Sequence, residues 1–289
     1  MRTLLYLKKR DHDVFYESLI RRHSDLIDKS LQNKIRYTKI GLAGLGSIGS
    51  RIAETIVRLG AEYLIIADPD IIELSNLNRQ NYNLKQLRKP KALCIKEILR
   101  NINPYINIDA HTEGINLNNV TKIFKKTEVV FDTMDKYLPK VILHRAMRSL
   151  GVPIIHATYF GYTVAVTTFM PNGISYEEML QLPSRGRDIH AISETELTEH
   201  RRKIMREFGL RIYSEQIINK NQPSVAFILS SIIASQFAVA ELIKYLNGDK
   251  DNLTIAPQIL EVDVLTNQIK KREYENDDPS FACLFSYYT

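Results

Sequence analysis

The sequence predicts a doubly wound α/β fold with a mostly parallel sheet, antiparallel strands in its C-terminal part and an N-terminal helical extension. Between residues 39 and 157, short apolar runs alternate with segments whose apolar residues recur at helical spacing. Strand–helix alternation at this spacing implies right-handed crossovers and therefore parallel strands. After Gly161 the pattern changes to residue-by-residue alternation, which is typical of an antiparallel strand.

The N-terminal half supplies the parallel part of this sheet. Residues 13–35 carry mixed charges with apolar residues at helical spacing, and they predict one or two helices. The pattern then predicts strands over 39–43, 63–67, 106–111, 129–131 and 153–157. The intervening segments predict helices over 50–59, 91–101, 118–124 and 140–150.

The C-terminal half is organised differently. An antiparallel strand is predicted over 162–170. Residues 183–222 are polar and charged, and they predict a mobile crossover segment with one basic helix over 197–208. Residues 225–246 predict a long, buried apolar helix, and 259–265 a closing strand. The chain therefore divides into an N-terminal helical extension (1–36), one domain that includes the crossover segment (37–270) and a C-terminal tail (271–289).

Composition excludes several classes of protein. The chain has 289 residues, of which 44% are hydrophobic and 25% charged, values ordinary for a soluble globular protein and unlike those of a disordered or collagen-like chain. No run of eighteen apolar residues occurs, so no transmembrane helix is expected. The apolar stretch at the N-terminus is too short for a signal-peptide core. The net charge of +6 is spread along the chain, which permits an anionic partner, such as a nucleic acid, without supporting one.

The two cysteines, Cys94 and Cys283, are too few for a disulfide framework or a four-cysteine zinc site. A reducing, cytoplasmic location is therefore expected. Cys94 falls in a predicted helix and is expected in the core.

The run GLGSIG at residues 44–49 predicts a nucleotide site. It follows a predicted strand and opens a helix, and Asp68 ends the next strand about twenty residues later. Glycines allow a tight turn and close approach to phosphates, the helix N-terminus offers N–H groups, and the acid can bind ribose hydroxyls. The alternative is that these glycines serve only helix–strand packing.

Two cations follow this acid, Arg79 within SNLNRQ (75–80) and Lys91 after Pro90. Fixed cations here suit phosphate transfer, because they can neutralise a triphosphate and its leaving pyrophosphate. An oxidoreductase that uses NAD has no such need. The alternative is a solvated loop whose charges face water.

The run DTMD at 132–135 ends the fourth predicted strand. Ligands bind at the carboxyl ends of strands in such sheets, and an aspartate there can ligate Mg²⁺ beside phosphates. One of the two aspartates could instead cap the following helix.

Together these residues resemble the ThiF family, the adenylating domain shared with ubiquitin-activating enzymes and the molybdopterin-synthase activator. The resemblance runs from about residue 21 to 264. It is densest at GLAGLGSIG (41–49), DPDIIELSNLNRQ (68–80), PK (90–91), NINP (101–104) and DTMD (132–135).

The resemblance implies a Rossmann-like fold that binds ATP and Mg²⁺. It implies adenylation of a carboxylate, such as the C-terminus of a peptide or a small ubiquitin-like protein, and a homodimer. By resemblance, the phosphates would be cradled by Gly44, Gly46 and Gly49 and contacted by Asn76, Arg79 and Lys91. The ribose would be held by Asp68, and magnesium by Asp135. The resemblance also implies an arginine supplied by the partner subunit, which is Arg21 or Arg22; we select Arg22.

The sequence departs from the family pattern in three ways. It has no CxxC pairs, so a structural zinc is not expected. Residues 158–260 contain no cysteine, which argues against a thioester step. Lys136 stands where relatives have asparagine, and Lys140 is a candidate for the basic residue that usually follows.

Three residues near the expected site have open roles. His156 is a candidate base or acyl contact, or a hydrogen-bonded structural histidine. Tyr159 and Tyr162 could line an acceptor groove or pack under the crossover. The charged run at 200–203 is expected to be a solvated helix face.

Other functions are alternatives to the hypothesis of carboxylate adenylation. A tRNA-directed, base-cyclising ligase or dehydratase of the same superfamily would need a coherent basic surface around Lys85, Arg88, Lys89 and Arg201. A non-catalytic nucleotide-binding scaffold is the alternative from outside the enzymes. A dehydrogenase would transfer hydride with NAD and need no magnesium.

Overall fold

The computed structural model describes residues 11–207 and 226–274. One eight-stranded sheet forms the centre of the molecule, with the strand order β3-β2-β1-β4-β5-β6-β7-β8. Its strands are β1 (Lys39–Ala43), β2 (Tyr63–Ala67), β3 (Asn107–His111), β4 (Val129–Asp132), β5 (Ile154–Phe160), β6 (Thr163–Phe169), β7 (Gln258–Asp263) and β8 (Gln268–Glu273).

Strands β1 to β5 run parallel, and β6, β7 and β8 add antiparallel strands at one edge. This arrangement confirms the predicted doubly wound sheet with its C-terminal antiparallel part. The order reverses at β1, which pairs with both β2 and β4. The crevice outside the carboxyl ends of strands at such a point is where ligands bind in open α/β sheets.

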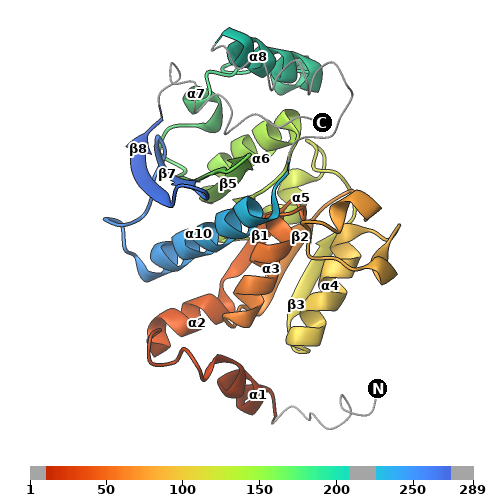
Figure 1. Cartoon of the computed structure of the whole chain (residues 1–289), viewed down its shortest axis with the longest axis vertical. Helices are drawn as coiled ribbons and strands as arrows, with labels where there is room; N and C mark the ends of the chain where they lie inside the picture. The colour runs from red at the N-terminus through yellow and green to blue at the C-terminus, as the bar shows by residue number, and fades with distance from the viewer. Residues whose placement is uncertain (1–10, 208–225, 275–289) are drawn as a thin grey trace.

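Helices cover both faces of the sheet (Figure 1). They are α1 (Asp11–Ile20), α2 (Lys29–Tyr37), α3 (Gly49–Arg58), α4 (Lys91–Ile102), α5 (Val120–Phe124), α6 (Tyr137–Leu150), α7 (Tyr176–Met179), α8 (Glu194–Glu207) and α10 (Ile228–Asn247).

The strand alternation directs side chains into two cores. In β1, Ile40 and Leu42 point toward α3, α4 and α10, whereas Ala43 joins the core under α5 and α6. In β4, Phe131 joins the first core and Val130 the second. This two-sided burial explains why the central strands are near-continuous apolar runs.

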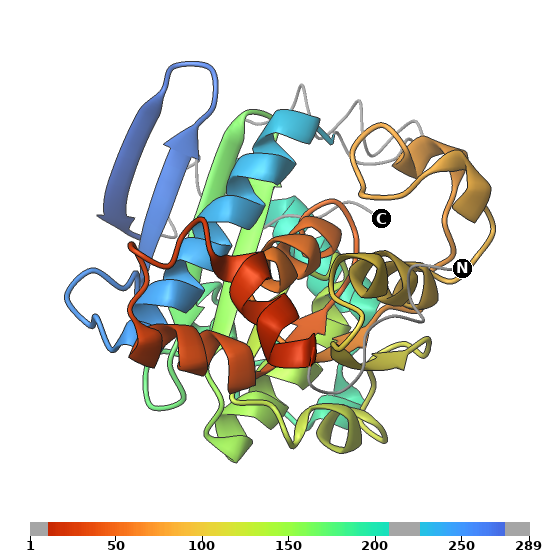
Figure 2. The same ribbon diagram turned by 90° about the horizontal axis from the view of Figure 1, so that it is seen from below.

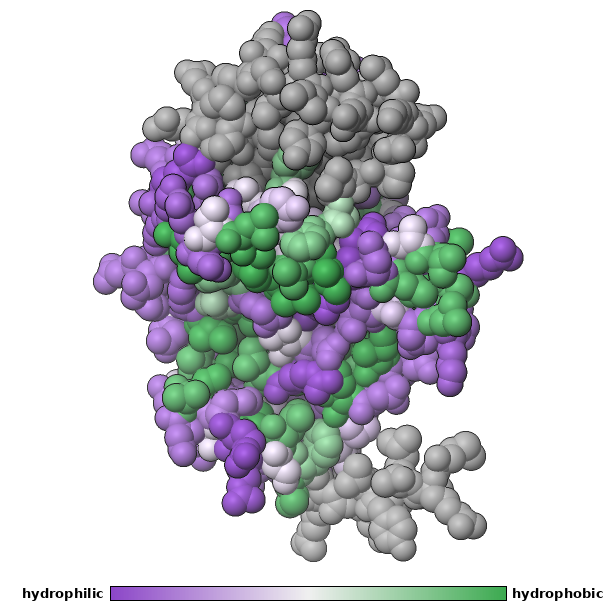
Figure 3. Space-filling view, in the orientation of Figure 1, coloured by the Kyte–Doolittle hydropathy of each residue, from purple (hydrophilic) through white to green (hydrophobic). Residues whose placement is uncertain are grey.

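Helix α10 packs against β5, β6 and α3, which agrees with the long core helix expected near the C-terminus. Figure 2 shows α10 and α3 side by side on one face of the sheet. By length and composition alone α10 could cross a membrane, but the same test is passed by core helices. Its inner face is buried, and on the outer surface apolar groups are interspersed with polar ones (Figure 3).

The N-terminal extension, for which the sequence predicts one or two helices, forms two, and they dock at the amino ends of the strands (Figure 1). The Gln32 side chain donates to the carbonyl of Leu59 and to the Tyr16 hydroxyl. The Arg36 guanidinium lies 2.9 Å from the buried carboxylate of Glu62.

Three predictions need correction. The tail predicted from 271 begins inside β8, an edge strand whose exposed side chains gave no apolar alternation. The described part of the crossover segment, 183–207, packs on the rest of the protein. Leu197 is fully buried, and the Arg145 guanidinium donates to the carbonyls of Ser184 and Arg187. Residues 208–222 lie outside the described residues. Arg201, expected on a solvated face, is only 2% exposed.

Candidate functional site

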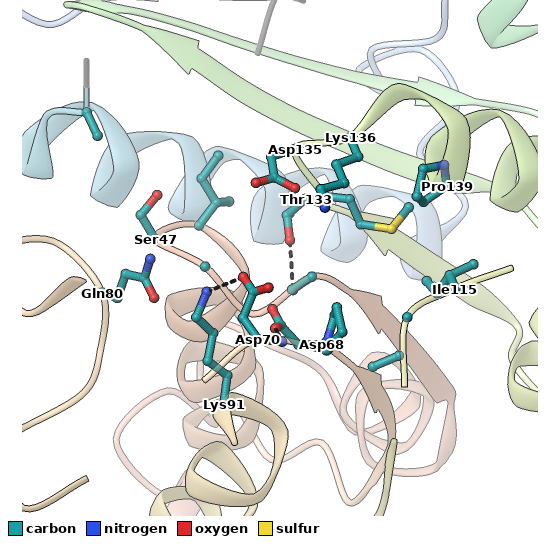
Figure 4. A pocket seen from close by; sticks show the side chains of 18 of the residues that line it. Ser47, Asp68, Asp70, Gln80, Lys91, Ile115, Thr133, Asp135, Lys136 and Pro139 are labelled. Carbon is teal, nitrogen blue, oxygen red and sulfur yellow. Dashed lines mark hydrogen bonds and ion pairs between the residues drawn. The ribbon is translucent and has the colours of Figure 1, made fainter. Parts of the chain in front are cut away.

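A cavity of about 300 Å³ opens at the carboxyl ends of the parallel strands (Figure 4). Three loops supply most of its polar lining, and β5 and α4 complete it. The predicted residues that line it are Gly44, Gly46, Asp68, Arg79, Lys91 and Asp135. The structure thus brings together six residues that span the sequence from position 44 to position 135.

The loop after β1 approaches the cavity as bare backbone. Gly44 has a φ of +92°, and a Cβ there would meet the carbonyl oxygen of Thr133 at 2.8 Å. At Gly46 the nearest atom to such a Cβ is the amide nitrogen of Gln80, 4.0 Å away. Gly46 therefore faces open space that an anionic group can enter.

Gly49 has a different position from the one expected. It is the first residue of α3, and a Cβ there would lie 2.1 Å from the carbonyl oxygen of Gly44 and 2.6 Å from the Thr133 hydroxyl. It does not line the cavity. Gly49 serves the close approach of helix to strand, the packing role considered for these glycines.

Asp68 follows β2 and is almost fully buried. Its carboxylate accepts hydrogen bonds from the backbone N–H of Leu45 at 2.6 Å and of Asp70 at 2.8 Å. Burial raises its pKa to about 6, against the opposing pull of the Lys91 charge. The carboxylate is thus fixed in orientation at the cavity, where it can accept from ligand hydroxyls.

Lys91 begins α4 and points into the cavity, where its ammonium lies 2.7 Å from the Asp70 carboxylate (Figure 4). With a side chain only 7% exposed, it does not belong to a solvated loop. Asp70 was not singled out in the sequence, although its spacing of two from Asp68 was a visible signal.

Arg79 lies at the rim, half-buried. Its guanidinium donates to the carbonyl of Ser75 at 2.7 Å and to the Asn78 side chain at 3.0 Å. These bonds orient the group toward a cavity it helps to line. The Tyr159 hydroxyl lies beside it, 3.1 Å from the Ser47 hydroxyl.

Asn76 is not brought to the cavity. Its side-chain oxygen accepts from the backbone N–H of Glu73 and closes a capping box on a short 3₁₀ turn, Leu74–Asn76. The residue is buried in that turn. Asn76 therefore has a structural role in the turn that precedes Arg79, and its phosphate contact stays a prediction.

Asp135 and Lys136 occupy the loop between β4 and α6, are both exposed, and both line the cavity (Figure 4). Mg²⁺ in nucleotide sites is held by one or two carboxylates together with phosphate oxygens and waters. Asp135 is placed to be such a carboxylate.

Asp132, by contrast, lies beneath the cavity and is fully buried. The Lys140 ammonium contacts both its oxygens at 3.1 Å, and His144 and His156 each approach one oxygen at 3.0 Å. These cationic and hydrogen-bonding neighbours hold the pKa of Asp132 well below its usual range. Burial and the Lys140 charge lower the pKa of His156 to about 4.

This cluster settles several open roles. His156 is the hydrogen-bonded structural histidine, and neither Asp132 nor Asp135 caps α6, whose N-cap is Lys136. Lys140 is buried on Asp132 rather than facing the cavity, because its ammonium neutralises that carboxylate. One ligand atom each of Asp132, His144 and His156 lies within 4.8 Å of the others, which is close enough for a metal site. The ammonium of Lys140 already occupies the cation position beside this carboxylate.

Arg22 is exposed in the segment between α1 and α2. Figure 1 shows these two helices at the end of the molecule away from the carboxyl ends of the strands. Arg22 takes no part in the cavity of its own chain. The basic surface needed for a tRNA partner is incomplete, since Lys85, Arg88 and Lys89 are exposed but Arg201 is buried.

Comparison with known proteins identifies a family. Residues 19–284 match the ThiF family. The sulfur carrier protein ThiS adenylyltransferase of Bacillus subtilis is 28% identical over 148 residues, 50% of this chain and 44% of that protein. The SAMP-activating enzyme E1 of Haloferax volcanii is 25% identical over 146 residues, 50% of this chain and 54% of that protein. The chain spans about half the length of these curated relatives.

Solved structures show the same fold. PaaA superposes with a TM-score of 0.68 at 16% identity, covering 93% of this chain and 85% of PaaA. Escherichia coli MccB, solved with ATP, gives a TM-score of 0.65 at 19% identity, covering 84% of this chain and 66% of MccB.

Proposed function

The chain belongs to the ThiF family, and from that membership we propose that it is an ATP-dependent adenylyltransferase that activates a carboxylate. One observation carries the proposal: a bare glycine loop, an oriented acid, two cations and an exposed aspartate surround one cavity. The relatives named as adenylyltransferases and the MccB structure with ATP support it.

The residues present fit a magnesium nucleotide. Gly46 leaves space for phosphates just before the start of α3, and Gly44 permits the turn that brings this loop to the cavity. Asp68 presents acceptor oxygens for ribose hydroxyls. The exposed carboxylate of Asp135 would hold Mg²⁺. Magnesium, when bound, would supply positive charge that stabilises the phosphates.

The reaction would join a carboxylate oxygen of the acyl substrate to the α-phosphorus of ATP, while the bond to the bridging oxygen breaks and pyrophosphate leaves. Arg79 and Lys91 would stabilise the negative charge that grows on the phosphates. Because Lys91 is held by Asp70 and Arg79 by Ser75, both cations are oriented before the nucleotide binds.

The acyl substrate we propose is a peptide or a small ubiquitin-like protein with a C-terminal carboxylate. Support comes from relatives named for sulfur carrier proteins and from MccB solved with MccA. Tyr159 and Phe160, at the end of β5, line the cavity, as Ala226 does, and would offer apolar contacts to such a tail.

We propose that activation ends at the acyl-adenylate without a thioester. Cys94 is buried in α4, and burial raises the pKa of its thiol, so it is a poor nucleophile. Cys283 lies outside the described residues. The adenylate would pass directly to an amine or sulfur acceptor.

The test is exchange of labelled pyrophosphate into ATP. The purified protein is incubated with ATP, Mg²⁺ and a panel of sulfur-carrier or ubiquitin-like proteins and synthetic peptides. Each peptide is paired with its C-terminally amidated form, which lacks the reacting carboxylate. Exchange with free-acid forms only, lost in Arg79→Ala, supports the proposal. Equal exchange with the free-acid and amidated forms of a peptide would contradict the proposal, and so would hydride transfer with NAD.

A further inference from the structure

Helix α8 makes a direct contact with the start of α6. The carboxylate of Glu194, the first residue of α8, accepts hydrogen bonds from the backbone N–H groups of Tyr137 at 2.9 Å and Leu138 at 2.6 Å. The partners are 57 and 56 residues apart in the sequence. A local sequence pattern therefore cannot predict this contact.

The contact supplies hydrogen-bond acceptors for the first N–H groups of α6. The first N–H groups of a helix have no partner within it, and the N-cap residue usually supplies one. Here the N-cap is Lys136, whose side chain makes no capping bond. Glu194 takes over that role, and its negative charge also suits the positive end of the helix dipole.

The capped end of α6 carries the cavity residues Asp135 and Lys136. The loop that holds them is anchored on its other side by Asp132, whose carboxylate accepts from the Met134 N–H at 3.2 Å and binds Lys140 on the first turns of α6. The loop is thus fixed at both ends, by Asp132 from below and by Glu194 from α8.

Glu194 is itself held in place. The Thr198 hydroxyl donates to one of its oxygens at 3.2 Å, and Leu197 in the same turn is fully buried in the core under α6. The carboxylate reaches α6 only while α8 stays docked.

We propose that Glu194 is a positioning residue that fixes the Asp135–Lys136 loop at the nucleotide cavity through the N-terminus of α6. The role of Asp135 rests on the proposed function. The prediction for the loop rests on contacts of the protein alone. The position of the Asp135–Lys136 loop then depends on the docking of helix α8, because Glu194 reaches α6 only from the docked helix.

The test compares wild type with Glu194→Ala, Glu194→Gln and a matched control, Glu199→Ala. Glu199 is on the same helix, is exposed and pairs only with Arg202 among the interactions described for it. The first readout is hydrogen exchange of the Tyr137 and Leu138 amides. The second is the Mg²⁺ concentration that gives half of the maximal thermal stabilisation by ATP.

In Glu194→Ala we expect both amides to exchange at least about tenfold faster. The Mg²⁺ requirement should rise about tenfold, as for other residues that orient a metal ligand. ATP stabilisation in chelator should not change, because Glu194 makes none of the contacts described for Asp68 or the glycine loop. Glu194→Gln, which keeps an acceptor but no charge, should fall between wild type and Glu194→Ala, and Glu199→Ala should behave as wild type.

Faster exchange with an unchanged Mg²⁺ requirement would overturn the proposal, since Glu194 would then be a helix cap only. Unchanged exchange would overturn it as well. If wild type itself shows no magnesium effect on ATP binding, the assignment of Asp135 fails with the proposed function. In that case the exchange rates of the Asp135 and Lys136 amides, recorded in the same experiment, decide whether Glu194 holds the loop: rates unchanged in Glu194→Ala would overturn the proposal.

Discussion

Asp68 and Asp70 show how two like residues on one loop take different tasks. Asp68 is buried, fixed by two backbone N–H groups, and directs its remaining lone pairs into the cavity. Asp70 is largely exposed and holds the Lys91 ammonium. The sequence pattern located Asp68, because strand, spacing and chemistry agree there. It could not assign Asp70, whose role depends on the direction of a lysine side chain twenty-one residues away.

The raised pKa of Asp68 makes nucleotide binding depend on pH. A carboxylate accepts two ribose hydroxyl bonds only when ionised, so ATP affinity should be constant above about pH 7 and fall as the pH drops through about 6. Below that value the dissociation constant should rise by about tenfold per pH unit. Calorimetric titration between pH 5 and 8 measures this.

The matched variant is Asp68→Asn, which cannot ionise. Its affinity should be weaker and nearly independent of pH in this range. The same pH dependence in both proteins would show that another group, such as the nucleotide itself, is responsible.

At the scale of elements, the strands and helices of the central sheet follow from the sequence because their burial is periodic. Strand β1 and strand β2 have the expected bounds. Helix α6 begins at Tyr137, three residues before the predicted start, because Pro139 falls in the first turn, where its missing N–H costs nothing.

Long-range contacts account for the elements that sequence reasoning missed. Strand β8 is exposed and polar, and only its pairing with β7 makes it a strand. Arg201 lies in a charged run yet is buried, because α8 docks on the protein. The Glu194 cap on α6 likewise depends on tertiary contact.

The glycine loop and α3 offer a prediction at this scale. Gly49→Ala should destabilise the fold by about 1–3 kcal/mol, since its Cβ would lie 2.1 Å from the Gly44 carbonyl oxygen and the helix must shift. Gly46→Ala should leave stability within about 0.5 kcal/mol, because its Cβ meets no atom nearer than 4.0 Å. The added methyl of Gly46→Ala should instead weaken ATP binding.

Urea unfolding and ATP titration of both variants separate the two effects. A lower stability of Gly46→Ala than of Gly49→Ala, or wild-type stability of Gly49→Ala, would contradict these roles of the two glycines.

At the scale of the whole molecule, the fold places the nucleotide cavity and the N-terminal helices at opposite ends of the sheet (Figure 1). Arg22 therefore cannot complete its own cavity. If it contributes to catalysis, as the family resemblance implies, it must act on the cavity of a second copy. A homodimer remains a prediction, and Arg22 gives it a specific test.

Arg22→Ala and Asp135→Ala should each lose pyrophosphate exchange. When the two variants are mixed and allowed to exchange subunits, one site of each mixed dimer has both residues intact, so about a quarter of wild-type activity should return. Arg21→Ala serves as the neighbouring control. No recovery from proteins that demonstrably exchange subunits would show that Arg22 does not act across the dimer.

We propose that the cavity binds ATP with magnesium held at Asp135. The most direct test of this proposal is the thermal stability of the purified protein with ATP and Mg²⁺, with ATP and chelator, and with NAD, repeated on Asp135→Ala. A ligand at a hundredfold excess over its Kd adds about 2.7 kcal/mol to the stability of the folded state. We predict stabilisation by ATP that is larger with Mg²⁺, and loss of that magnesium increment in Asp135→Ala. Stabilisation by NAD alone, or a magnesium increment that survives in Asp135→Ala, would contradict the account.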